Sequence, residues 1–178
     1  MSKKFTAKRI TTCGLVAALL CILGPLSIPI GPVPISLTNL VIYLSAFLLC
    51  PTDTLWSFLI YFLVGLCGLP VFSGFSAGFS KIMGPTGGYL IGFFFTAILS
   101  GLSVKYFPKN KILQFVGLFI ATLIAYAFGT AWYIILTATP LFTSFTVCVL
   151  PFIPGDLIKI FISVYVGNII KNRLNRNI

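Results

Sequence analysis

The sequence predicts an all-α integral membrane protein: a bundle of six transmembrane helices with its N- and C-termini in the cytoplasm. Three observations predict this fold class. Apolar residues make up 58% and charged residues 8% of the 178 residues, against roughly 45–50% and 25% in soluble domains. The eleven prolines separate long apolar windows, and the positive charges form three clusters. Soluble enzymes and nucleic-acid binders are excluded, because twelve basic and two acidic side chains cannot cover a soluble globule of this size.

Proline placement defines the expected helices, because proline inside a helix removes a hydrogen bond that hydrocarbon cannot replace. Six Pro-free windows each contain an apolar run near the roughly 17–25 residues that cross a bilayer, although one of them is short. The basic start indicates a retained first helix, since no clear signal-peptide cleavage site follows it. Within one transmembrane domain covering 1–178, we expect helices over roughly 8–25, 35–50, 53–69, 86–105, 111–138 and 152–173.

The charge pattern orients this bundle. Four basic residues lie in the N-terminal segment, three in 105–111 and three in 171–176, whereas the junction near Pro51 carries only Asp53. Ten of the twelve positive charges therefore fall on one face, which the positive-inside rule makes cytoplasmic. Lys81 and Lys159 remain in the outer half.

Two irregular segments on the outer face are rich in Gly, Pro and Ser, at 25–35 and 69–88. Non-helical backbone at membrane depth is tolerated where it is buried in protein or lines a cavity. We therefore expect both segments to fold over the bundle.

The candidate binding residues with the strongest chemical signal are Asp156 and Lys159, at the start of the last helix. Their spacing places both on one helix face, and we expect Asp156 in the first turn, where the helix dipole favours an anion. Ionisable groups in a membrane usually face the bundle interior and mark function. The pair is interpreted either as a polar ligand site, with Lys159 receiving a carboxylate, or as an internal ion pair that only orients the helix.

A glycine-rich turn, Gly84-Pro-Thr-Gly-Gly-Tyr89, enters the fourth expected helix. Such a turn can expose backbone N–H groups to a ligand, or it can simply start a helix. Its spacing is not that of a P-loop or a dinucleotide motif. The candidates it contributes are Thr86, Gly87, Gly88 and Tyr89; Asn39 and Trp132 are weaker polar candidates elsewhere.

The first helix carries small residues at four-residue spacing, a pattern that lets another helix approach closely. One stripe contains Cys13, Ala17 and Cys21, and the neighbouring stripe contains Gly14 and Ala18. Their target is either a helix of this bundle or another subunit, so the candidate docking residues are Gly14, Ala17, Ala18 and Cys21.

The residue inventory limits catalysis and metal binding. The chain has no His and no Glu, so neither an HExxH zinc site nor a Ser-His-Asp triad can be built. The five cysteines include no CxxC and are interpreted as small apolar residues. We expect no catalytic residue, no metal and no cofactor.

Several segments together resemble a known family. GPVPIS at 31–36, GLPVFSGFSAGFSKIMGPTGGYLIGF at 68–93, Gly129-Thr-Ala-Trp132 and PFIPGDLIK at 151–159 are similar to the BioY family. Its members are the biotin-specific substrate-binding (S) components of energy-coupling factor (ECF) transporters. The resemblance covers essentially the whole chain, with its motifs in the same order.

The resemblance implies high-affinity capture of biotin from the outer face of a bacterial cell membrane by a multi-pass, non-enzymatic subunit. It implies partnership with a transmembrane coupling subunit and two cytoplasmic ATPase subunits, which use the ATP. It places Asp156, Lys159 and Gly87-Gly88-Tyr89 in the substrate site. Lys159 is expected to take the biotin carboxylate and Asp156 the ureido N–H groups; alternatively, backbone amides of 86–89 hold the acid.

Three other functions stay open at this point. A subunit of the same architecture could bind a different small vitamin. A membrane-embedded enzyme would need a Cys, Ser or Tyr nucleophile beside Asp156 or Lys159. The chain could also be a channel or a structural membrane protein; a continuous polar pore lining would favour a channel, and the second and third expected helices offer almost none.

Overall fold

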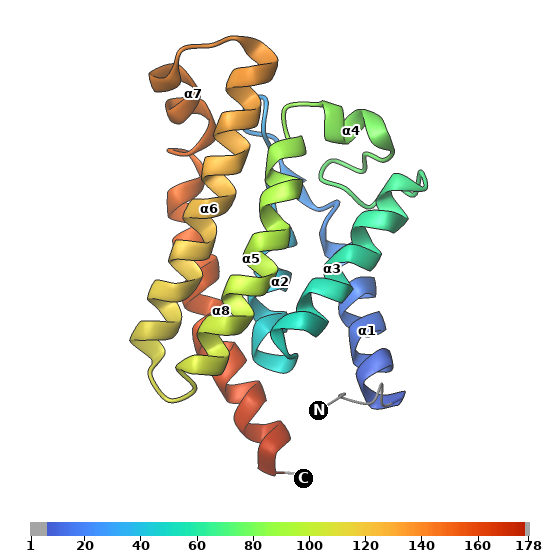
Figure 1. Ribbon diagram of the computed structural model, residues 1–178, viewed down its shortest axis with the longest axis vertical. Helices are drawn as coiled ribbons and strands as arrows, with labels where there is room; N and C mark the ends of the chain where they lie inside the picture. Colours follow the sequence, from blue (N-terminus) through green and yellow to red (C-terminus); the bar gives the residue numbers. More distant parts are fainter. Residues whose placement is uncertain (1–6, 177–178) are drawn as a thin grey trace.

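The computed structural model describes residues 7–176, which form eight helices and one short antiparallel strand pair (Figure 1). The ends of the expected domain, 1–6 and 177–178, lie outside the described residues, and Lys3 and Lys4 of the basic N-terminal cluster lie there too. The elements are α1 (Ala7–Leu23), β1 (Ser27–Ile28), β2 (Ile35–Ser36), α2 (Thr38–Leu48), α3 (Pro51–Leu66), α4 (Phe79–Met83), α5 (Gly87–Tyr106), α6 (Lys111–Thr137), α7 (Leu141–Cys148) and α8 (Phe152–Arg176).

Three of these helices, α5, α6 and α8, are long and apolar enough to cross a membrane. The other three expected spans correspond to the shorter apolar helices α1, α2 and α3. The shortest is α2, whose 11 residues extend about 16 Å at 1.5 Å per residue, against a hydrocarbon core of about 30 Å. It begins at Thr38 rather than 35 because Ile35 and Ser36 pair with Ile28 and Ser27.

Two short helices and the strand pair were not expected. The α7 helix starts directly after Pro140 and ends before Pro151, and its eight residues are too few to register as a span. The α4 helix lies inside the Gly- and Ser-rich segment 69–88. Together with the β1–β2 pair, α4 and α7 lie at one end of the molecule, here termed the loop end (Figure 1).

The opposite end gathers the described basic clusters and is here termed the basic end. The start of α1, the α2–α3 junction, the α5–α6 connection and the end of α8 all lie there (Figure 1). Asp53 at the α2–α3 junction accepts hydrogen bonds from both Nε (2.9 Å) and Nη2 of Arg9. This bidentate pair joins α1 to α3 and accounts for the acidic residue on an otherwise basic face.

Small residues bring α5 and α6 into close contact. A Cβ added to Gly92 would lie 2.8 Å from the Cα of Ala125, and one added to Gly88 would overlap the carbonyl oxygen of Phe128. Association of helices in lipid depends on such packing, because the hydrophobic effect does not drive apolar helices together when the surrounding lipid is equally apolar. The resulting α5–α6 pair forms one wall of the space between the helices.

We predict that Gly92→Ala lowers the thermal stability of the purified protein, because the methyl group has to displace the α6 backbone. Overpacking of this kind costs about 1–3 kcal/mol. Gly14→Ala is the matched control, since nothing lies within 4 Å of a Cβ at that helical position. The measurement is the apparent melting temperature in detergent, and an unchanged value for Gly92→Ala contradicts the packing argument.

Candidate functional site

A cavity lies between the helices and extends to the irregular segments of the loop end. Its walls come from α2, α3, α5, α6 and α8, and from the segments that precede α2 and α5. About 600 Å³ of its space is free of protein atoms, counting the part open to solvent. Val33, Pro34 and Ser73 line it, so both irregular segments contribute to the wall.

A buried ion pair forms one side of this cavity. Lys159 Nζ lies 2.9 Å from Asp156 Oδ1, and the two residues are only 8% and 5% exposed. The expectation that Asp156 lies in the first turn of its helix is wrong. The helix starts at Phe152 and its first turn holds no acidic residue. It can start before Pro154 because a proline within the first turn costs no backbone hydrogen bond.

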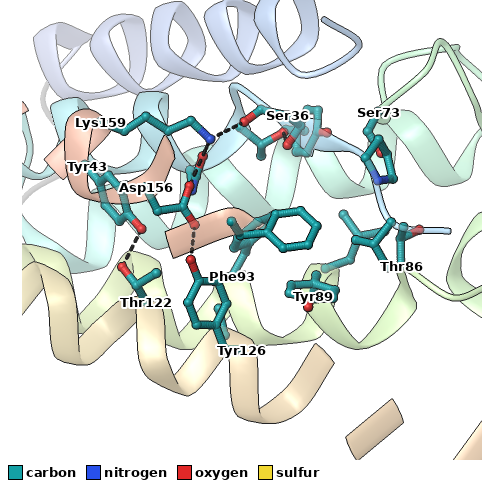
Figure 2. Close-up of a pocket in the computed structure, with 18 residues that line it drawn as sticks. Ser36, Tyr43, Ser73, Thr86, Tyr89, Phe93, Thr122, Tyr126, Asp156 and Lys159 are labelled. Atoms are coloured by element: carbon teal, nitrogen blue, oxygen red, sulfur yellow. Dashed lines mark hydrogen bonds and ion pairs between the residues drawn. The ribbon is translucent and has the colours of Figure 1, made fainter. Parts of the chain in front are cut away.

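Neutral polar groups complete the hydrogen bonding of the pair. Lys159 Nζ donates to the Ser36 carbonyl (2.8 Å), Asn39 Oδ1 (3.1 Å) and Asp156 Oδ1, which uses all three protons of the ammonium. Asn39 Nδ2 donates to Asp156 Oδ1 (2.7 Å) and the Tyr126 hydroxyl to Asp156 Oδ2 (2.6 Å). The ion pair and these three partners, from α2, α6, α8 and β2, are here called the polar cluster (Figure 2).

A second hydroxyl pair lies beside the polar cluster. Thr122 donates to the Leu118 carbonyl (2.8 Å), so the Tyr43 hydroxyl, 2.6 Å from Thr122 Oγ1, is the donor of that contact. Both residues line the cavity. The Tyr43 oxygen therefore keeps a lone pair for a ligand.

Aromatic side chains separate the polar cluster from the far side of the cavity. Phe93, Tyr89 and Phe152 line this stretch, and Figure 2 shows the Phe93 ring between the ion pair and the side chains of Ser73 and Thr86. Tyr89 presents only its ring, because its hydroxyl donates to the Cys148 carbonyl. The cavity is thus elongated, apolar in the middle and polar at both ends.

Of the eight predicted binding residues, five line the cavity: Asn39, Thr86, Tyr89, Asp156 and Lys159. Gly87, Gly88 and Trp132 do not appear in its lining. A Cβ on Gly87 would overlap the Ile82 carbonyl oxygen, and Trp132 Nε1 donates to the Gly84 carbonyl (3.1 Å). These three residues let the chain turn tightly into α5 and fasten that turn to α6.

Two backbone amides of the glycine-rich turn are used within the turn. Gly87 N donates to the Gly84 carbonyl (3.1 Å) and Tyr89 N to the Thr86 carbonyl (3.2 Å). The amides of Gly87 and Tyr89, two of those considered in the sequence analysis as donors to the biotin carboxylate, are therefore already paired.

The candidate docking residues of α1 divide between two faces. Ala17 is buried and Cys21 packs against the core, so this stripe contacts helices of the same chain. Gly14 and Ala18 are exposed. The two stripes distinguished in the sequence thus serve different surfaces.

Several lining residues were missed from the sequence, notably Tyr126, Thr122, Tyr43 and Tyr61. Thr122 and Tyr126 are four residues apart, and Tyr43 follows Asn39 by four. That spacing puts each pair on one helix face, and it is the feature of the sequence that could have identified these residues as lining the cavity. Among the described residues, no group of three or more Cys and Asp could hold a metal ion.

Comparison with known proteins gives consistent results. A family model described as the BioY family matches residues 1–176. A probable biotin transporter BioY of Pyrococcus horikoshii is 34% identical over 171 residues, which is 96% of this chain and 98% of that protein. The biotin transporter BioY of Thermotoga maritima is 32% identical over 161 residues, covering 90% and 94%.

One solved structure is similar over nearly the whole chain. It is the S-component for biotin from an ECF-type ABC transporter, with a TM-score of 0.88 and 32% sequence identity. The match covers 97% of this chain and 95% of the other.

Proposed function

Because the chain belongs to the BioY family, we propose that it captures biotin in this cavity as the substrate-binding subunit of an ECF transporter. The observation that carries the proposal is the polar cluster, buried at one end of an elongated cavity. A subunit that binds and delivers a vitamin performs no covalent step, so the chain is a membrane transport protein and not an enzyme.

The cavity matches the chemistry of biotin group by group. Biotin has a ureido ring with two N–H donors and one carbonyl acceptor, an apolar thioether ring and tail, and a terminal carboxylate. Asp156 Oδ2 accepts one hydrogen bond from Tyr126 and keeps an acceptor position for a ureido N–H. Lys159 can exchange one of its neutral acceptors for the ureido carbonyl, while Phe93 and Phe152 contact the apolar parts.

Charge balance favours one of the two orientations left open by the sequence. Asp156 and Lys159 neutralise each other, and all three Lys159 protons are donated. A carboxylate placed here would bring an uncompensated negative charge next to Asp156, whereas a ureido group is neutral. We therefore orient the ureido ring toward the polar cluster and the carboxylate toward the far end.

We predict that Lys159→Met weakens biotin binding about 30-fold or more, because Asp156 is left as an unpaired buried carboxylate. Truncating one partner of such a pair costs about 2 kcal/mol or more. Lys105→Met is the matched control, since it removes the same charge from an exposed position of α5. Isothermal titration of purified protein with biotin measures both.

The same titration separates biotin from the alternative ligand class, a different small vitamin. Wild-type protein is titrated with a panel of vitamins under identical conditions. Binding of another vitamin but not biotin overturns the substrate assignment, and unchanged biotin affinity in Lys159→Met removes that residue from the site.

We propose further that the chain crosses the cell membrane of a bacterium six times, with the basic end in the cytoplasm. The collection of Arg9, Lys105, Lys109, Lys111, Lys171 and Arg173 at that end supports the orientation, because cytoplasmic loops carry an excess of positive charge. The loop end of the cavity then faces the exterior, where biotin is captured.

Native cysteines allow this topology to be tested. Cys50 is exposed at the start of α3 and Cys67 at its end, so they lie on opposite sides of the proposed membrane. In variants that retain only one of the two, with the other four cysteines replaced by alanine, we predict that a membrane-impermeant maleimide labels Cys67 in intact cells. Cys50 should react only after permeabilisation; the reverse pattern would invert the topology.

We propose that the exposed stripe of α1, Gly14 and Ala18, docks on the transmembrane coupling subunit, which assembles with two ATPase subunits. The stripe is flanked by Leu15 and Ile22, which are 57% and 65% exposed. Small residues between large apolar ones let a partner helix approach the backbone. ATP hydrolysis by the partners then supplies the energy for inward release.

We predict that Gly14→Leu abolishes co-purification with the coupling module and leaves biotin affinity unchanged. The leucine fills the surface through which the partner helix would approach, and no residue of the cavity lies near it. Ala127→Leu, at an exposed position of α6, is the control for a general effect of added bulk. Normal assembly of Gly14→Leu would exclude this stripe as the docking surface.

A further inference from the structure

The cavity contains buried hydroxyl groups without partners, and one of them, on Thr86, lies at its far end. Thr86 is 7% exposed and Tyr61 is fully buried, and both line the cavity. Neither Thr86 Oγ1 nor the Tyr61 hydroxyl has a hydrogen-bond partner in the described part of the chain. Native proteins pair nearly all their buried polar groups, because an unpaired one keeps its full desolvation cost. These two hydroxyls therefore indicate a polar occupant of the cavity.

A cation without a carboxylate partner lies beside this end. Lys81 Nζ donates to the Ser73 carbonyl at 3.1 Å, and Ser73 lines the cavity. The sequence contains only two acidic side chains, and Arg9 binds one of them while Lys159 binds the other. Burial lowers the pKa of Lys81, the direction expected of a cation that has lost water and gained no anion.

The segment that carries Lys81 is fixed to the rest of the molecule. Gly74 N donates to the Pro25 carbonyl (3.0 Å) and Gly78 N to the Gly65 carbonyl (2.8 Å), both before α4. After α4, the Gly84 carbonyl accepts from Trp132 Nε1. Lys81 is thus held on a braced loop, and a preorganised cation binds an anion without the cost of ordering the loop.

We propose that Lys81 and Thr86 form an anion-binding pole that recognises the carboxylate of the ligand, opposite the polar cluster. The ammonium supplies the positive charge, and the Thr86 hydroxyl donates a hydrogen bond to a carboxylate oxygen. In Figure 2 Thr86 and Ser73 lie on the other side of Phe93 from Asp156 and Lys159, as a ligand with a polar group at each end requires. This inference rests on the proposed function and adds the residues that select a carboxylate over its neutral analogues.

The test compares biotin with biotinamide, in which a neutral amide replaces the carboxylate. Wild-type protein should bind biotin more tightly than biotinamide. Lys81→Met should lower biotin affinity about tenfold or more, leave biotinamide affinity unchanged and so remove the preference. Lys81→Arg should retain it, and Lys105→Met is the control for loss of an exposed positive charge.

Thr86→Val provides a second, independent variant, since it removes the hydroxyl at nearly constant shape. The Thr86 side chain makes no capping hydrogen bond to α5, so the helix start loses nothing. We expect Thr86→Val to lower biotin affinity less than Lys81→Met does and to leave biotinamide affinity unchanged. Asp156→Asn, in contrast, should weaken biotin and biotinamide equally, because the polar cluster reads the ureido ring.

The outcomes separate this inference from the proposed function. Failure of wild-type protein to bind biotin overturns the proposed function. Biotin binding with no preference over biotinamide, or an equal loss of both ligands in Lys81→Met, overturns the anion-binding pole alone. If Lys81→Met does not yield folded protein, the ratio of biotin affinity to biotinamide affinity in Thr86→Val tests the anion-binding pole instead.

Discussion

Asp156 and Lys159 lie three residues apart on α8, and each would be costly to bury alone. The polar side of the cavity consists of the groups that compensate for this cost. An ionisable side chain at the bilayer centre costs about 2.5–3.5 kcal/mol on insertion scales. Asp156 and Lys159 neutralise each other, and the remaining donor and acceptor positions are filled by Asn39, Tyr126 and the Ser36 carbonyl. Because these partners belong to α2, α6 and β2, satisfying the pair also fixes three elements around α8.

A different kind of packing joins α5 to α6. The α5–α6 pair is joined by the close approach of Gly88 and Gly92 to the α6 backbone, without buried charge. This explains why the glycine-rich turn is distinctive in the sequence although Gly87 and Gly88 do not line the cavity: their role is to let α5 lie against α6. Tyr89, next in the chain, can then turn its ring into the cavity while its hydroxyl binds the Cys148 carbonyl.

Sequence reasoning therefore identified the charged residues of the site better than its neutral ones. Asp156, Lys159 and Asn39 are conspicuous because polar side chains are rare in apolar helices. The i, i+3 spacing of Asp156 and Lys159 places these two charges side by side. Tyr126 and Tyr43 are not conspicuous, since an aromatic residue in such a helix is equally suited to lipid contact or core packing. The Ser36 carbonyl, the β1–β2 pair and the start of α8 at Phe152 depend on backbone geometry between distant segments, which residue identity does not encode. Proline spacing placed the long helices but passed over α7, whose eight residues fit between two prolines.

The scarcity of acidic residues has a further physical consequence. Asp53 and Asp156 are the only acidic side chains, and within residues 7–176 they form ion pairs with Arg9 near the basic end and with Lys159 beside the cavity. The other cations of the basic end lie apart from the cavity and do not line it. Lys81 is different, because it is partly buried at the loop end against a cavity wall that offers only a carbonyl oxygen. With the proposed anion-binding pole at Lys81, an anion that enters the cavity gains most when its charge lies at the loop end and its neutral polar group reaches the α8 pair.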